Sequence, residues 1–498
     1  MFYYSTRDIN KEKKYTSAEV IKKGLADDGG LFVPEAIPSL SADEIQWLCE
    51  DEYPVRAAKI LSRFLTDYTY EELLEDCTQA YHPNSFVGGT APLTHIKENL
   101  YTLELWHGPT AAFKDMALQL MPRLLSRALI KTGETRTALI LVATSGDTGK
   151  AALEGYKDIP GVKIMVFYPA DGVSRVQKLQ MATQTGNNVR VCAVKGNFDD
   201  TQSGVKKIFS DEKIAGLLNQ NHYFLSSANS INWGRLAPQI VYYVSAYCDL
   251  LKAGTIQPGE VVNVCVPTGN FGNIFAAYIA KRMGLPLGKL VCASNSNNVL
   301  TDFFKTGVYN KVRPFHLTMS PSMDILISSN LERLLYFCAG AEKTREYMKA
   351  LAATGAYKVD GAFLNTIDSD FVGYYADESN TADTIRRYFF ENNQLIDTHT
   401  AVGCFCAEQY RKEQKSNDSV MVVASTASPY KFASDVYTSL TGTTPSDDLD
   451  ALTMLSQLTQ TEIPYPLCGL GERAVRFTEI IPTTAMPEKV LAFAGEEE

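Results

Sequence analysis

Short apolar runs alternate with longer amphipathic segments between residues 105 and 300. The runs that predict strands lie at 138–143, 163–169, 189–194 and 261–267, with a later one at 418–426. Near-continuous apolar runs of this length are typical of strands covered on both faces. The helical patterns between them lie at 173–184, 201–211 and 235–254. This alternation predicts an α/β protein with parallel sheets and right-handed crossovers, whose ligands bind at the carboxyl ends of the strands.

The two flanks of this region have a different pattern. The first 95 residues contain charged helical stretches and no run of buried strands, and residues 300–400 are mostly helical, for example at 328–355. The whole chain of 498 residues is too long for one simple domain, so we expect two or three.

Composition and charge narrow the class of protein. Hydrophobic residues make up 45% and charged residues 21%, which excludes a disordered chain. The formal net charge of −10, without a block of Lys and Arg, argues against binding to nucleic acid or to anionic membranes. The ten cysteines form no C-x-x-C pair, the N-terminus lacks a signal-peptide core, and no apolar run approaches the ~20 residues of a membrane span. We therefore expect a reduced, cytoplasmic protein.

The segment 103–129 carries the strongest candidate for chemistry. Lys114 is expected in the first turn of a helix, next to Phe113, where both the helix dipole and apolar neighbours lower the pKa of an amine. Most lysines are simply solvated, but this combination suits a lysine that forms a Schiff base. Pro122 either kinks this helix or begins a second one. Of the six histidines, none has metal-ligand spacing, and His107 is the one we place near the chemistry.

Two glycine-containing loops follow predicted strands. Residues 144–149 (TSGDTG) turn into a helix that begins near Lys150, and their N–H groups and hydroxyls could face an anion or simply cap the turn. Only two residues separate Gly146 from Gly149, so this is not a Walker A loop, and a P-loop ATPase is excluded. Residues 269–273 (GNFGN) repeat the design without a dinucleotide fingerprint, which favours a single phosphate group.

Two further polar segments complete the set. Ser425 and Thr426 follow the late strand and could either cap the next helix or donate to a ring nitrogen. Asn229, Ser230 and Arg235 open a helix. Arg235 could be an ordinary surface arginine, or it could hold a second phosphate together with the Ser.

Four strings in this order, HGPTAAFKD, ATSGDTG, PTGNFGN and TASPYKF, resemble the threonine synthase family of pyridoxal-phosphate (PLP) enzymes. The N-terminal YYSTRD, TMSPSMDI at 318–325 and DTHTAVG at 397–403 resemble the same family, so the likeness spans residues 2–432. The resemblance implies two parallel-sheet domains of the tryptophan-synthase-β fold type with an additional N-terminal region. The expected division is 1–95, then 96–255 with the lysine and a carboxylate loop, then 256–498 with the PLP phosphate loop.

The resemblance also implies a role for each candidate residue. Lys114 is similar to the Schiff-base lysine, and Thr426, or the adjacent Ser425, to the hydroxyl that contacts the pyridine nitrogen. The implied PLP phosphate loop is Gly269, Asn270, Phe271, Gly272 and Asn273. The implied loop for the substrate α-carboxylate is Thr144, Ser145, Asp147 and Thr148, although the wider fold type often has Asn where Asp147 stands. The implied substrate-phosphate residues are Asn229, Ser230 and Arg235.

The implied reaction converts O-phospho-L-homoserine and water to L-threonine and phosphate, with PLP and no metal. It requires two phosphate sites, and the chain offers two candidates. The alternatives are a PLP-dependent serine/threonine dehydratase or sulfhydrylase, neither of which needs the second site, and a non-catalytic regulator that binds PLP or an amino acid. We expect a small-molecule substrate as the only partner, in a monomer or a homodimer.

Overall fold

Two parallel sheets organise the computed structural model, which describes residues 1–144, 146–171, 173–414 and 418–496. The larger sheet has six strands in the order β13-β10-β9-β14-β4-β3, and β3 alone runs antiparallel to its neighbour. Its strands are β13 (Phe371–Tyr375), β10 (Leu287–Ser294), β9 (Val262–Pro267), β14 (Met421–Ser425), β4 (Leu100–Glu104) and β3 (Leu93–Lys97). The predicted α/β class with parallel sheets is confirmed.

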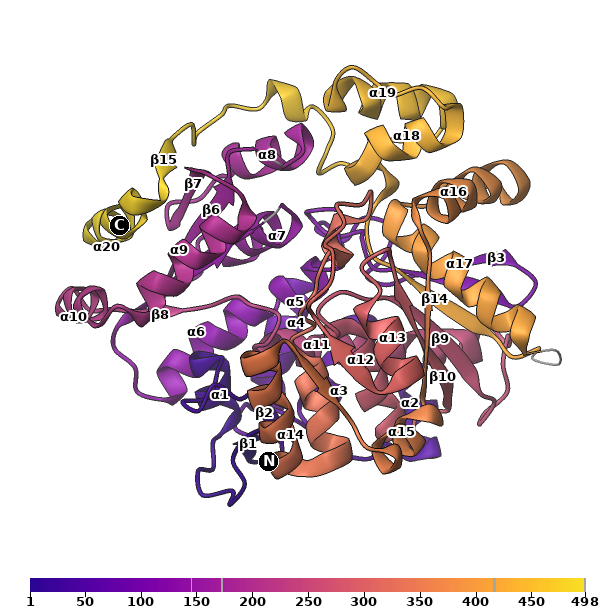
Figure 1. Ribbon diagram of the computed structural model, residues 1–498, viewed down its shortest axis with the longest axis horizontal. Coiled ribbons are helices and arrows are strands. Elements are labelled where there is room, and N and C mark those ends of the chain that lie inside the picture. Colours follow the sequence, from indigo (N-terminus) through magenta and orange to yellow (C-terminus); the bar gives the residue numbers. More distant parts are fainter. Residues whose placement is uncertain (145, 172, 415–417, 497–498) are drawn as a thin grey trace.

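The smaller sheet has five parallel strands in the order β15-β7-β6-β5-β8. These are β15 (Ile480–Pro482), β7 (Val189–Lys195), β6 (Val162–Pro169), β5 (Thr137–Ala143) and β8 (Tyr223–Ser226). The C-terminal segment, yellow in Figure 1, crosses from the larger half to place β15 beside β7. Both sheets thus combine distant parts of the chain, and the expected division at 95 and 255 stays a prediction.

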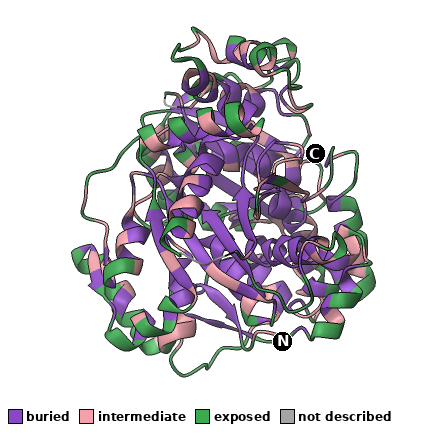
Figure 2. Cartoon of the chain, turned by 90° about the vertical axis from the view of Figure 1, so that its right-hand side faces the viewer, coloured by how far each residue is buried: buried purple, intermediate pink, exposed green. Residues whose placement is uncertain are grey.

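The predicted strands and helices occur where the apolar pattern placed them. All eight residues of β6 are buried, as are the six of β9, because helices cover both faces. Figure 2 shows this distribution, with buried strands inside and exposed residues on the outer helices. The helices of the smaller half are α7 (Asp147–Tyr156), α8 (Arg175–Ala182), α9 (Phe198–Ser210) and α10 (Glu212–Gln220), and α11 (Trp233–Lys252) joins it to the larger half.

The later helices surround the larger sheet and lead to the C-terminus. They are α12 (Gly272–Arg282), α13 (Val299–Thr306), α14 (Leu331–Thr354), α15 (Gly361–Asp368), α16 (Glu378–Asn392), α17 (Thr398–Glu413), α18 (Ala433–Thr441), α19 (Asp448–Thr459) and α20 (Met486–Gly495). The strands β11 (Val308–Asn310) and β12 (Ala356–Lys358) form an antiparallel pair. Two short 3₁₀ turns, η1 (Pro321–Met323) and η2 (Pro429–Phe432), enter the site described below, and η3 (Leu470–Glu472) and η4 (Thr483–Ala485) flank β15. Among the described residues, no helix is long and apolar enough to cross a membrane.

The N-terminal region packs onto α11. It consists of the antiparallel pair β1 (Tyr3–Ser5) and β2 (Phe32–Pro34) with α1 (Ser17–Lys23), α2 (Ala42–Leu48), α3 (Tyr53–Leu61) and α4 (Tyr70–Ala80). Thr16, Ser41 and Thr69 each form a capping box, which satisfies N–H groups of the helices that they begin. The Tyr3 and Trp233 rings lie 5.5 Å apart, and Arg56 forms an ion pair of 2.6 Å with Asp249.

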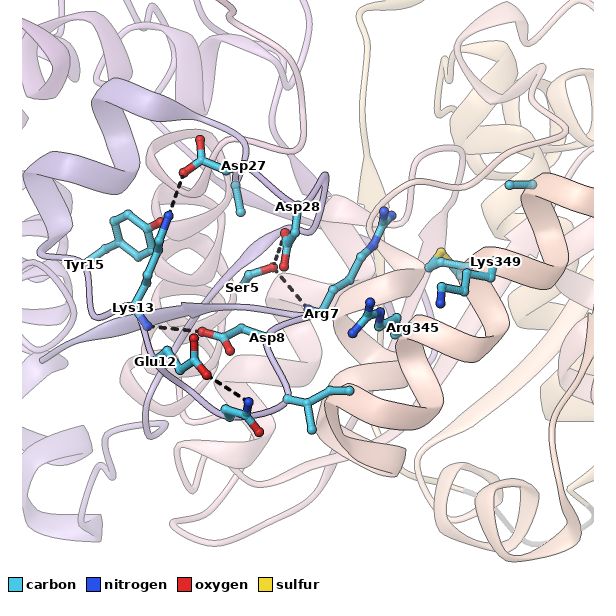
Figure 3. A pocket seen from close by; sticks show the side chains of 15 residues that line it. Ser5, Arg7, Asp8, Glu12, Lys13, Tyr15, Asp27, Asp28, Arg345 and Lys349 are labelled. Atoms are coloured by element: carbon cyan, nitrogen blue, oxygen red, sulfur yellow. Dashed lines mark hydrogen bonds and ion pairs between the residues drawn. The ribbon is translucent and has the colours of Figure 1, made fainter.

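A groove of about 680 Å³ separates the N-terminal segment from α14 (Figure 3). Two of its basic side chains form ion pairs: Lys13 with Asp27 at 3.4 Å, and Arg7 with Glu332 at 2.8 Å. The Arg7–Glu332 pair attaches the segment to α14, and the groove contains none of the predicted site residues.

Pro122 begins a second helix, so the predicted long helix after Lys114 is two short ones. They are α5 (Asp115–Leu118) and α6 (Met121–Lys131), with Pro122 in the first turn of α6, where a missing N–H is tolerated. Helix α5 lies close against α7, because Gly155 has no side chain. A Cβ built on Gly155 would lie 1.8 Å from the carbonyl oxygen of Leu118.

We predict that Gly155→Ala destabilises the protein, since neither backbone can move without separating α5 from α7. Overpacking of this kind typically costs about 1–3 kcal/mol. Gly216→Ala is the matched control, because Gly216 also lies in a helix but has nothing within 4 Å of its Cβ position. That change should raise stability by up to about 1 kcal/mol. Calorimetric midpoints that move equally in both variants would contradict this view of the α5–α7 contact.

Candidate active site

A buried polar cluster forms where four elements meet near the ends of the two sheets. Lys114 precedes α5, Asp147 begins α7, Ser322 lies in η1 and Lys431 in η2. The Lys114 Nζ lies 3.3 Å from Asp147 Oδ2 and 3.3 Å from Ser322 Oγ. The Ser322 hydroxyl donates to Asp147 Oδ2 at 2.9 Å, and Lys431 Nζ lies 3.0 Å from Asp147 Oδ1. One carboxylate therefore holds two lysines and a serine.

Lys114 has the properties of a reactive amine, and of the two expected causes, burial and the helix dipole, burial is the one that acts. It is 8% exposed and is the N-cap of a helix of only four residues, not part of its first turn, so a helix dipole contributes little. Burial lowers the pKa of its amine. Asp147 raises that pKa, while the charges of Lys431 and Arg235 lower it further. Desolvation therefore favours the neutral, nucleophilic amine.

Asp147 is an ionised carboxylate in a buried place. Burial raises its pKa, but the positive charges of Lys431 and Lys114 outweigh this and hold the pKa well below its ordinary value. Gln177 Nε2 donates to Oδ1 at 2.9 Å, so both carboxylate oxygens have partners. The helix α7 begins at Asp147, three residues before Lys150, where the sequence pattern had placed its start.

The loop 269–273 fits a phosphate group. Among the described residues, the backbone N–H groups of Asn270, Phe271, Gly272 and Asn273 have no acceptor, and they lie at the start of the eleven-residue helix α12. The Asn273 Nδ2 is likewise buried without a partner, although Tyr242 donates to its Oδ1 at 2.7 Å. Phe271 has a left-handed φ of 63°, which turns the loop into α12. Unpaired donors at a helix N-terminus suit an anion.

The loop 144–149 is partly a cap. The Thr144 hydroxyl accepts from Gly146 N at 3.0 Å and from Gly149 N at 2.9 Å, so the ordinary capping role, which the sequence left open, occurs here. Thr148 is partly exposed, and its backbone N–H has no acceptor among the described residues. Ser145, predicted for the same role, lies outside the described residues.

Ser425 and Thr426 differ in their hydrogen bonding. Ser425 Oγ accepts from the Trp106 indole N–H at 3.0 Å and lies 3.0 Å from the Thr400 hydroxyl. Thr426 is 5% exposed, and its hydroxyl has no partner within the part of the chain that the structure describes. The Thr426 hydroxyl is therefore the one available to a ligand.

The third predicted group opens α11. Arg235 is 5% exposed, and its Nη1 donates to the Ala228 carbonyl oxygen at 2.8 Å. Burial lowers its pKa to about 10, which still leaves it charged near neutral pH. No carboxylate of the described residues forms an ion pair with it, so the charge is buried without an anion. Ser230 Oγ lies 3.3 Å from Asn229 Oδ1, and these two residues are more exposed.

Three residues of the cluster were not singled out from the sequence: Ser322, His399 and Lys431. The strings TMSPSMDI, DTHTAVG and TASPYKF contain them, but each residue alone has the pattern of a solvated side chain. His399 Nε2 accepts from the Ser322 backbone N–H at 3.1 Å, and its Nδ1 lies 3.0 Å from Asp397. His107, the histidine expected near the chemistry, instead contacts Glu104 at 2.7 Å and the Val87 carbonyl.

Comparisons with known proteins agree along the whole chain. Residues 87–426 match the sequence model described as "Pyridoxal-phosphate dependent enzyme". Residues 2–81 match "Threonine synthase N terminus", and residues 400–490 match "Threonine synthase, C-terminal". Threonine synthase from Pseudomonas aeruginosa is 38% identical over 502 residues, covering 100% of this chain and 98% of its own length. "Threonine synthase-like 1" from Homo sapiens is 40% identical over 86% of this chain, which spans 60% of that relative's length.

Solved structures give the same result. The crystal structure of PLP-bound threonine synthase from Brucella melitensis has a TM-score of 0.88 and 35% identity, covering 100% of both chains. Threonine synthase from yeast has a TM-score of 0.88 at 32% identity, covering 99% of each. These matches confirm the expected fold type. Because sequence models and solved relatives agree from the N-terminal region to the C-terminal helices, the chain belongs to the threonine synthase family of pyridoxal-phosphate-dependent enzymes.

Proposed function

We propose that this chain converts O-phospho-L-homoserine and water to L-threonine and phosphate, with PLP held by Lys114. The strongest support is that two separate groups able to bind an anion, the loop 269–273 and Arg235, lie around the desolvated Lys114. One accounts for the cofactor phosphate and the other for the substrate phosphate. The cytoplasmic location and the monomer or homodimer expected from the sequence stay predictions.

The residues present fit PLP as follows. The N–H groups of residues 270–273 would hold its phosphate, and the Thr426 hydroxyl its pyridine nitrogen. When bound, PLP withdraws electrons from the Cα of an attached amino acid, which makes the Cα proton removable. A threonine hydroxyl leaves the ring nitrogen less charged than an aspartate would, which moderates this withdrawal.

The chain's own groups then handle protons and leaving group. Lys114, once displaced by the substrate's amine, is a neutral base that takes the Cα proton and later returns a proton. Ser322 and Asp147 orient that amine through contacts of 3.3 Å. Arg235 would hold the γ-phosphate through its loss, because a guanidinium offers two parallel hydrogen bonds. Loss of the γ-phosphate also requires that a proton leave Cβ. A proton then returns at Cγ, the hydroxyl of water adds at Cβ, and the proton returned to Cα gives threonine.

The N-terminus of α7 would receive the substrate α-carboxylate. The Thr148 N–H has no acceptor among the described residues and lies in the first turn of a ten-residue helix. Thr144 would act indirectly, because its hydroxyl accepts hydrogen bonds from Gly146 and Gly149 and so fixes the turn before the helix. Asp147 faces the two lysines, so we assign it to the amine and not to the substrate carboxylate, which it would repel.

A dehydratase, a sulfhydrylase or a non-catalytic regulator of the same fold would share the lysine and the phosphate loop. None of them needs a buried arginine without an anion beside that lysine. The desolvation of Arg235 is unfavourable unless an anion compensates it. We therefore favour the phosphorylated substrate.

Lys114→Ala should abolish phosphate release from O-phospho-L-homoserine while leaving the fold intact, since the Lys114 side chain makes no capping hydrogen bond and Ala accepts the backbone angles of this position. Borohydride reduction of the parent protein with PLP, followed by peptide mapping, should label Lys114. Labelling of another lysine, or turnover by the alanine variant, would refute the assignment.

Gly272→Val should weaken PLP binding through the phosphate alone. A Cβ at Gly272 would lie 3.4 Å from Asn330 Nδ2, an ordinary contact, so the protein itself accepts a side chain there. Loss of one charge-assisted hydrogen bond corresponds to about 1.5–3 kcal/mol, or roughly ten- to hundredfold in Kd. Gly269→Ala is the contrasting variant, because its Cβ would lie 2.7 Å from the Ser322 carbonyl oxygen and should also lower the melting temperature. Unchanged PLP affinity in Gly272→Val would exclude the loop as the phosphate site.

Arg235→Met should lower kcat/KM for O-phospho-L-homoserine about ten- to hundredfold, since a charge-assisted contact is lost. PLP absorbance and affinity should be retained, and any side activity on unphosphorylated L-serine should survive. Arg56→Met is the matched control: Arg56 is equally buried but paired with Asp249, so its loss should reduce stability without distinguishing substrates. Equal losses on both substrates in Arg235→Met would show that Arg235 supports the fold or the cofactor, and the proposed function would lose the feature that separates it from a dehydratase.

A further inference from the structure

Lys431 is the most enclosed charged group of the cluster, and nothing in the proposed reaction uses it. It is 2% exposed, and its Nζ donates to the Thr110 carbonyl oxygen at 2.8 Å and lies 3.0 Å from Asp147 Oδ1. A lysine is rarely buried to this extent without a functional or structural reason.

The two lysines around Asp147 are not equivalent. Lys431 has two acceptors, a carbonyl oxygen and a carboxylate oxygen, which suit an ammonium group with N–H bonds to donate. Lys114 shares Asp147 Oδ2 with the Ser322 hydroxyl and lies farther from the carboxylate, at 3.3 Å against 3.0 Å for Lys431. One carboxylate can neutralise one ammonium group, and the geometry favours Lys431 for that pairing.

We propose that Lys431 is a positioning residue that takes up the charge of Asp147, so that Lys114 remains a neutral amine able to bind the cofactor and accept a proton. Without Lys431, Asp147 would pair with Lys114 and keep it protonated. With Lys431 in place, Asp147 orients the Lys114 amine but does not hold its proton. The inference rests on the proposed role of Lys114.

Other charges around the pair act in the same direction or are already compensated. From α11, Arg235 also lowers the pKa of Lys114, and from α17, His399 lies near Asp147. Asp115 from α5 faces Lys431; burial raises the pKa of its carboxyl to about 6, and Thr110 donates to both of its oxygens. Lys150 of α7 pairs with Glu154 at 2.8 Å. Asp147 is therefore the group that forms ion pairs with both lysines, Lys114 and Lys431.

The test measures how fast the PLP-free full chain captures added PLP as a function of pH. Lys114 reacts as the neutral amine: its nitrogen bonds to the aldehyde carbon of PLP, and the aldehyde oxygen leaves as water. The rate should rise with pH up to the pKa of Lys114 and then level off. In Lys431→Met the profile should move to higher pH by on the order of one to three units, the range for an uncompensated neighbouring carboxylate.

Three further variants separate charge from packing. Lys431→Arg keeps the charge and should keep a profile close to the parent's. Lys431→Met combined with Asp147→Asn removes both charges, and the pH midpoint of its capture rate should return toward that of the parent. Asp147→Asn alone should have a midpoint at lower pH than the parent. Lys163→Met is the control for loss of a buried lysine elsewhere, since Lys163 is also 2% exposed but bonds to the Glu496 carbonyl, and its profile should not move.

The outcomes are distinct. A uniform loss of capture at every pH in Lys431→Met would show a structural role and overturn the proposal. If that variant does not fold, the midpoint of Asp147→Asn against the double variant still isolates the charge of Lys431, and equal midpoints would overturn the proposal. Peptide mapping of the borohydride-reduced product guards the premise: a label on a lysine other than Lys114 refutes the proposed function, whereas a label on Lys114 with an unmoved profile refutes only the role of Lys431.

Discussion

The proposed function requires a buried amine, that of Lys114, to lose its proton, and this is the constraint on which the rest of the structure depends. Desolvation favours the neutral form of Lys114, but a carboxylate close enough to orient the amine raises the pKa of that amine and favours its protonated form. The structure satisfies both demands at Asp147, which contacts Lys114 and Lys431 through different oxygens. An arrangement of this kind works only where water is excluded, because bulk water would screen both effects.

Excluding water at that point requires elements from distant parts of the chain to converge. Lys114 comes from the segment after β4, Asp147 from the end of β5, Ser322 from η1 and Lys431 from the segment after β14. Strands β4 and β14 are neighbours in the larger sheet although they lie far apart in the sequence, so Lys114 and Lys431 leave the sheet at the same edge. The isolated bridge between Ala112 and Ala427 continues that pairing toward the site. The fold thus brings the two lysines together before any side chain is considered.

The sequence predicted the parts that depend on local pattern. The strand at 137–143 is a continuous apolar run because helices cover both faces, and the helix at 233–252 has its polar opening where Arg235 stands. Long-range pairing left no local signal: the three residues of β15 gain their place beside β7 only through the folded chain. The position of Lys114 before a four-residue helix was missed for a related reason, since apolar residues continue from α5 into α6 and hide the break at Gln119 and Leu120. Burial of Lys431 could not be predicted, because a lysine in a string such as SPYKF is usually solvated.

The coupling between Asp147 and Lys431 also explains why an acid can stand where the wider fold type often has an amide. An asparagine could orient the neighbouring lysine without charge, but it would leave a fully enclosed Lys431 without its counter-ion. An aspartate without Lys431 would hold the proton of Lys114. Asp147 and Lys431 therefore neutralise each other, and replacing either one alone leaves an uncompensated buried charge. Asp147 and Lys431 thus act together as an ion pair without net charge, which orients the Lys114 amine and leaves it neutral.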